Sequence, residues 1–120
     1  MEMNDLLKLF VHCPRNSPLF GVAREAAEVL RTSRKVKVVR GRSSPCEHYR
    51  EIYDRRLRRM KAINESVPGV EETVKMFSRC QGQLRGGYAL ADARTIHFWT
   101  DEAGELAGCV LSKPERRSGL

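Results

Sequence analysis

The strongest constraint on the fold is a change of sequence pattern after Gly86-Gly87. Three segments that follow, residues 88–91, 95–100 and 106–112, concentrate apolar, β-branched and aromatic side chains over lengths typical of strands. Their connections are short, and residues 101–104 (Asp-Glu-Ala-Gly) suit a tight turn whose glycine takes a positive φ. Because short turns join antiparallel neighbours, we predict an antiparallel β-meander in the C-terminal third.

Apolar residues at helical spacing predict three helices before the meander. A helix over 18–32 follows Ser17-Pro18, an N-cap with a proline at the first helical position. A second helix over 45–64 follows Ser44, with a proline in its first turn and a glutamate at the capping-box position. A third helix is predicted over 70–80. Its inward-facing residues should be Val70, Val74 and Phe77.

Two short apolar runs, 6–12 and 36–39, flank the first predicted helix and have the length of buried strands. A strand, a helix and a strand in succession predict a right-handed βαβ unit with parallel strands. We therefore expect the α/β (α+β) fold class: a βαβ start, two central helices and the meander, combined in a mixed sheet with helices packed on it. Residues 1–112 should form a single domain, and residues 113–120 a flexible basic tail.

The composition is that of a folded protein without a membrane span. Hydrophobic residues make up 41% of the 120 residues and charged residues 31%, and no apolar run approaches the roughly 18 residues that span a bilayer. Glu2 and Asp5 precede the first apolar run, where a secretory signal carries positive charge. The four cysteines are widely spaced, as in proteins with reduced thiols. We expect an intracellular, cytoplasmic protein, and a nuclear location is also compatible.

The positive charge is concentrated in one quarter of the chain. Residues 31–61 contain twelve lysines and arginines but three acidic residues, a balance of +9, whereas the rest of the chain has a balance of −2. Together these give the net charge of +7. Such asymmetry favours a polyanionic ligand or an acidic protein surface as the partner.

Within this quarter, the helix predicted over 45–64 has an apolar and a basic side. Its apolar stripe contains Tyr49, Ile52, Tyr53, Leu57, Met60 and Ile63. Glu51 and Asp54 stand four residues before two of its arginines, so ordinary i,i+4 pairs on a solvated face explain part of the pattern. They leave an excess of cations, and we predict that these contact phosphates without reading bases. The predicted basic surface comprises Arg40, Arg42, Arg50, Arg55, Arg58, Arg59 and Lys61.

Arg56 differs from its neighbours because it falls inside the apolar stripe. A guanidinium is costly to bury alone, so Arg56 is expected to be paired, stacked on an aromatic ring or placed at a subunit interface. Its predicted role is structural.

The meander offers a second binding surface. In the segment 95–100, alternation places His97 and Trp99 on the face opposite Ile96 and Phe98. On an open sheet face, His97 and Trp99 would be able to stack unpaired bases. The alternative is that Trp99 packs in a core or a dimer interface.

Neither a metal site nor a cofactor site is predicted. The His12-Cys13, Cys46-Glu47-His48 and Cys80 positions lack the two closely spaced ligand pairs of structural zinc sites. The segment VHCPRNSP (11–18) resembles the opening of thioredoxin- and glutaredoxin-like domains, over about the first 40 residues. The resemblance implies a reactive Cys13 between a strand and a helix. Asn16 stands where the resolving cysteine would be, which implies a monothiol or redox-inactive relative.

The sequence thus favours a non-enzymatic protein that binds nucleic acid, RNA rather than DNA, through the basic surface. The first alternative is a regulatory interaction module, a homodimer whose basic surface docks an acidic partner. The second is the single-cysteine thioredoxin-like domain.

Overall fold

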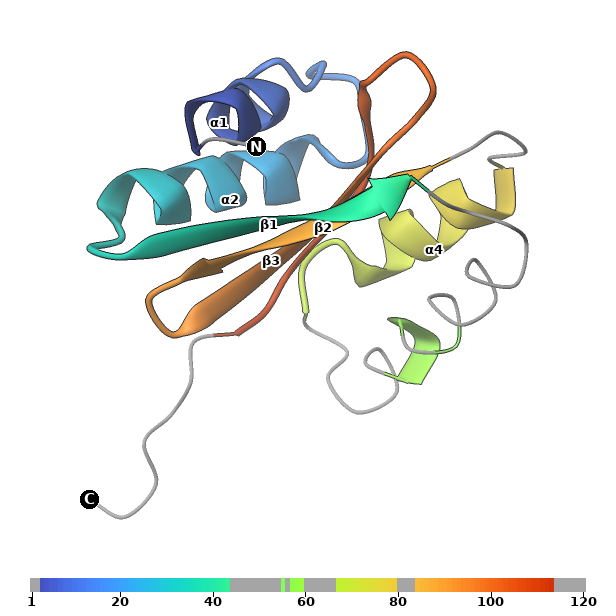
Figure 1. The fold of residues 1–120 in the computed structure, drawn as a ribbon. Coiled ribbons are helices and arrows are strands. Elements are labelled where there is room, and N and C mark those ends of the chain that lie inside the picture. The colour runs from blue at the N-terminus through green and yellow to red at the C-terminus, as the bar shows by residue number, and fades with distance from the viewer. Residues whose placement is uncertain (1–2, 44–54, 56, 60–66, 80–83, 114–120) are drawn as a thin grey trace.

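The computed structural model describes residues 3–43, 55, 57–59, 67–79 and 84–113, with the backbone alone for residues 40–43, 77 and 78. Figure 1 shows these residues as an antiparallel sheet with helices on both sides. The described helices and strands are α1 (Met3–Val11), α2 (Phe20–Thr32), β1 (Val36–Ser43), α4 (Val70–Arg79), β2 (Arg85–Ala91), β3 (Arg94–Thr100) and β4 (Leu106–Leu111).

The sheet has the strand order β1-β2-β3-β4, and every neighbouring pair is antiparallel. The predicted meander is confirmed, and Gly104 in its second turn has φ +80°. The α+β fold class is also confirmed. The predicted βαβ start and the mixed sheet are wrong, because β1 pairs with β2 from the meander, with Val38 opposite Ala89.

The segment predicted as the first strand, 6–12, belongs mostly to helix α1. Its buried residues, Leu6 and Phe10, are four positions apart and therefore lie on one helical face. Asp5 in the first turn and Lys8 in the last turn complement the helix dipole. A short apolar run fits a strand or a helix equally well, and here packing against α2 favours the helix.

Helices α1 and α2 cover the first face of the sheet (Figure 1). The helix predicted over 18–32 is confirmed by α2, which begins at Phe20. The predicted N-cap Ser17 with Pro18 at the first helical position is wrong, because the N-cap residue is Leu19 and has no side-chain cap bond. Ser17 Oγ instead accepts a hydrogen bond from Leu19 N–H at 3.2 Å, in the turn before the helix. Three of the five buried residues of α2 are alanines, Ala23, Ala26 and Ala27, and such small side chains allow a helix to pack closely on a sheet. The core between these layers includes Leu6, Phe10, Leu19, Val22, Ala23, Ala26, Leu30, Ala89, Ile96, Phe98, Cys109 and Leu111.

A smaller core lies on the second face, beneath α4. It consists of Leu57, Val67, Val70, Leu84, Trp99, Ala107 and Val110, with Val74 packed against it. The helix predicted over 70–80 is confirmed by α4, as are its inward-facing Val70 and Val74, whereas the side chain of Phe77 lies outside the described part of the structure. Of the helix predicted over 45–64, residues 55 and 57–59 are described, and they are helical.

Paired glycines on β2 make room for the large rings of β3. Gly87 is opposite Phe98 and Gly86 opposite Trp99. A Cβ on Gly87 would lie 2.6 Å from Phe98 Cζ, and one on Gly86 would lie 3.0 Å from Trp99 Cδ1. The rings therefore lie directly over the glycine backbone, which fixes the register of this hairpin.

The outer edge of β4 is closed by α4 and the turn before it. Thr73 Oγ1 accepts a hydrogen bond from Cys109 N–H at 2.9 Å and donates one to the Cys109 carbonyl oxygen at 3.0 Å. Leu111 N–H donates to the Pro68 carbonyl oxygen at 3.3 Å. These bonds satisfy backbone groups that an edge strand otherwise presents for pairing with another chain.

Within the described ranges, none of the helices has the length and apolar character that crossing a bilayer requires. The predicted tail beyond residue 113 lies outside the described residues.

Candidate nucleic-acid interface

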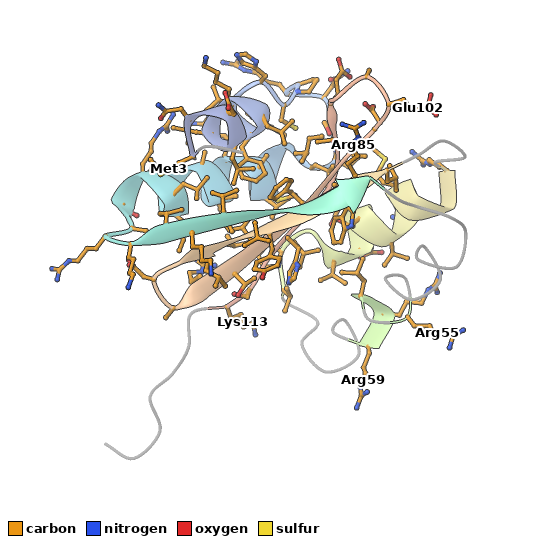
Figure 2. The ribbon with its side chains drawn as sticks, in the orientation of Figure 1. Met3, Arg55, Arg59, Arg85, Glu102 and Lys113 are labelled. Atoms are coloured by element: carbon orange, nitrogen blue, oxygen red, sulfur yellow. The ribbon has the colours of Figure 1, made fainter. Side chains whose placement is uncertain are left out.

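The described residues of the helix predicted over 45–64 separate apolar and charged side chains as the sequence predicts. Leu57 is buried in the second core, whereas Arg55, Arg58 and Arg59 are exposed. Figure 2 shows Arg55 and Arg59 pointing away from the sheet. The side chains that carry the charge are thus available to solvent at each of these three positions.

The remaining members of the predicted basic surface are described in part or not at all. Arg40 and Arg42 lie in β1, where the pairing register shifts between Arg40 and Ser43, and their backbone alone is described. Arg50, Arg56 and Lys61 lie outside the described residues. It therefore stays a prediction that all seven cations share one surface. The structural role of Arg56 stays a prediction as well.

An aromatic row crosses the second face of the sheet from β2 to β3. Tyr88 is directly opposite His97 in the register, and their ring centroids are 6.2 Å apart. The imidazole of His97 is stacked on the indole of Trp99, with 6.2 Å between centroids and an interplanar angle of 18°. The predicted placement of His97 and Trp99 on one face is confirmed.

The three rings differ in accessibility. Trp99 is 4% exposed and belongs to the second core, so the alternative in which it packs in a core is confirmed. Its burial leaves almost no ring surface for a base. His97 is half-buried and Tyr88 is 38% exposed, so the accessible end of the row is at β2.

Beyond Tyr88, the second face stays open toward β1. Leu90 is 40% exposed, and its register partner Lys37 is exposed as well. Val39, the partner of Tyr88, is half-buried. We call Lys37, Tyr88, Leu90 and His97 the open face. The two-residue spacing of Tyr88 and Leu90 predicts a shared face, but the exposure of that face depends on how the other elements pack, which strand alternation does not reveal.

The structure does not reproduce the thioredoxin-like opening. Residues before Cys13 form α1 rather than a strand, and the four described strands form no parallel pair. The implied strand–Cys-Pro–helix arrangement is therefore wrong, because this part of the chain packs on the sheet instead of entering it. Cys109 is fully buried, and burial, followed by the charge of nearby Cys13, raises the pKa of its thiol far above the usual range.

Among the described residues, no group of three or more histidine, cysteine, aspartate and glutamate side chains is placed to hold a metal ion. Cys46, His48 and Cys80 lie outside those residues.

Comparisons with protein-family models, with curated proteins and with solved structures return no match to this chain.

Proposed function

We propose that the protein binds single-stranded nucleic acid, RNA in preference to DNA, with phosphates on the basic surface and bases on the open face. The observation that carries the proposal is the position of Leu57. Leu57 packs in the same core as Trp99, and Trp99 in turn stacks on His97. The arginines that flank Leu57 and the aromatic row are therefore on the same side of the sheet, although about 40 residues separate them in the sequence.

The basic surface would supply most of the affinity. Each neutralised phosphate releases bound counterions, which contributes a slope of about −0.7 to the dependence of log K on log salt for a single strand. Arg55, Arg58 and Arg59 are exposed, and their guanidinium groups suit phosphate oxygens because they can donate two parallel hydrogen bonds. These contacts carry no sequence information, which fits a ligand bound largely irrespective of its sequence.

The open face would favour unpaired bases over a duplex. A base stacked on an accessible aromatic ring contributes roughly 1–3 kcal/mol, and Tyr88 offers such a ring beside His97. Bases in a duplex are already stacked and cannot lie flat on the sheet. Exposed Lys37 lies next to this platform, where it can contact the phosphate of a stacked nucleotide.

The test is fluorescence anisotropy with a labelled single-stranded RNA of about 20 nucleotides, titrated at several salt concentrations. We expect saturable binding at low salt that weakens as salt rises. The double variant Arg55→Glu/Arg59→Glu should weaken binding about tenfold or more and reduce the magnitude of the salt slope by about 1.4, one increment for each lost phosphate contact.

The matched control is Arg15→Glu/Arg31→Glu, which changes the net charge equally on the other side of the sheet. It should retain most of the affinity. Equal losses in the two double variants would show that net charge rather than a surface governs binding. Absence of binding to any single-stranded or duplex nucleic acid at low salt would overturn the proposal and favour the acidic protein partner.

A further inference from the structure

The exposed large hydrophobic side chains of the described residues fall in two places. Tyr88 and Leu90 belong to the open face, on the second face of the sheet. Met3 and Val11 lie on helix α1, which covers the first face. Val11 is 52% exposed, more than any other member of this set. The nucleic-acid proposal gives no reason for a large apolar side chain in water at this second place.

Val11 borders a groove between the end of α1 and helix α2. The groove holds about 720 Å³. Val11 and Phe20 are the accessible large apolar residues of its floor, and the nearly fully buried Phe10 and Ala27 lie beneath them. Its charged lining consists of Arg15, Arg24, Arg31, Glu25 and Glu28. An apolar floor with charged walls is the arrangement that accepts an amphipathic ligand.

The charged lining of the groove has three arginines and two glutamates, a net charge of +1. Arg24 is held over the ring of Phe20, with its guanidinium carbon 5.5 Å from the ring centroid, which leaves the edge of the guanidinium free to bind a carboxylate. Within the described part of the chain, neither Arg15 nor Arg24 forms an ion pair. Glu28 already contacts Arg31 at 3.9 Å, in an exposed i,i+3 pair that is weak enough to exchange partners.

We propose that this groove docks an acidic amphipathic helix of a partner protein. An open groove with a half-exposed Val11 would leave a small ligand largely in water, whereas a helix would cover Val11 and the floor together. Arg24 and Arg31 are seven residues apart on α2, which is about 10.5 Å along the helix axis. Carboxylates two turns apart on a partner helix aligned with α2 match this spacing, with leucines between them directed at Val11 and Phe20.

The groove and the proposed nucleic-acid surface lie on opposite sides of the sheet, as the positions of α2 and α4 in Figure 1 show. The docking proposal therefore does not depend on nucleic-acid binding, and the two ligands should bind at the same time. Saturating RNA is expected to leave the affinity for the helix unchanged, apart from electrostatic effects that salt suppresses.

The probe is a fluorescein-labelled helical peptide of about 18 residues, with glutamates two turns apart and leucines between them on one face. We expect saturable binding by anisotropy and chemical-shift changes confined to α1 and α2 in amide NMR spectra. A peptide with glutamine in place of each glutamate keeps the helix and removes the charges, and it should bind about tenfold more weakly.

On the protein, Arg24→Glu should weaken binding about tenfold and Val11→Ser severalfold, while the control Arg34→Glu, at an exposed position outside the groove, should bind normally. Val11 and Arg24 are exposed, so these variants should fold, which circular dichroism verifies. No saturable binding up to about 1 mM peptide, equal affinity for the glutamine peptide, or an equal loss in Arg34→Glu would each overturn the proposal.

Discussion

The hydroxyl of Thr73 should contribute substantially to stability because it joins α4 to the edge of the sheet. Thr73 is fully buried, and its Oγ1 makes hydrogen bonds of 2.9 and 3.0 Å with both backbone groups of Cys109. Replacing Thr73 by valine keeps the volume but removes both bonds. The buried Cys109 N–H then has no acceptor, which costs about 1–3 kcal/mol, and the lost bond to the carbonyl costs about 1 kcal/mol more. We expect Thr73→Val to lower the free energy of unfolding by about 2–4 kcal/mol.

The matched variant Thr73→Ser keeps the hydroxyl and removes the methyl group. That methyl group packs at Gly108, where a Cβ on the glycine would lie 2.8 Å from Thr73 Cγ2. Its loss should cost about 1 kcal/mol, the value for one buried methyl group. Valine should therefore be the more destabilising replacement, although it is the closer match in shape.

Urea denaturation followed by circular dichroism measures both variants, and amide hydrogen exchange reports on Cys109 N–H directly. Because a domain of this size has about 5–15 kcal/mol of total stability, the expected difference between the two variants is well within reach of the method. A serine variant less stable than the valine variant would refute the reasoning. It would show that packing at Gly108, not the pair of hydrogen bonds, holds α4 on the strand.

Three further predictions concern other points of the fold. Gly87→Ala should lower the free energy of unfolding by about 1–3 kcal/mol, because the added Cβ would lie 2.6 Å from Phe98 Cζ. The same change at Gly21 in α2, where an added Cβ would have no atom within 4 Å, should raise the free energy of unfolding by up to about 1 kcal/mol. Urea midpoints measure both variants, and a stability change of the same sign in the two would contradict the packing argument. Asp92 accepts hydrogen bonds from the backbone N–H groups of Arg34 and Lys35, just before β1, and has φ 53°. Asp92→Ala should therefore cost about 1–2 kcal/mol and Asp92→Asn less, which thermal unfolding would show. Cys109 should resist alkylation in the native state. Its thiol would ionise near pH 9.0 in the unfolded chain but stays protonated in the fold, so stability should fall as the pH rises past 9.0, and more steeply than in Cys109→Ala.

Local patterns were sufficient to predict the elements whose partners are close in the sequence. The meander, its glycine turn, α2 and α4 all follow from periodicity and turn residues, and all are confirmed. The strand predicted over 36–39 is confirmed, but its predicted partner is wrong. The local pattern favours the nearest apolar run, 6–12, whereas the actual partner is β2, about 50 residues away. Strand pairing at that separation depends on the packing of the whole chain and leaves little trace in a local pattern.

In the candidate interface, too, local patterns predict which way a side chain faces, whereas its accessibility depends on distant parts of the chain. Leu57 as a core residue and Arg55, Arg58 and Arg59 as exposed residues follow from the helical wheel, and the structure agrees at those positions. Placing His97 and Trp99 on one face needed nothing beyond strand alternation. Which rings of the aromatic row remain accessible depends on the second core, because that core contains Trp99 and does not contain Tyr88.

The two faces of the sheet differ in how fully the described residues cover them. A helix is about 10 Å wide and neighbouring strands are about 4.8 Å apart, so one helix covers roughly two strands. On the first face, α1 and α2 together can cover four strands, and alternate residues of β2, β3 and β4 are buried there. On the second face the smaller core, to which Leu57, Val67 and Leu84 contribute together with α4, buries Trp99 but leaves Tyr88 and Leu90 exposed on β2. A folded chain that leaves two large apolar side chains side by side in water has a surface suited to a flat apolar ligand, and an unpaired base is such a ligand.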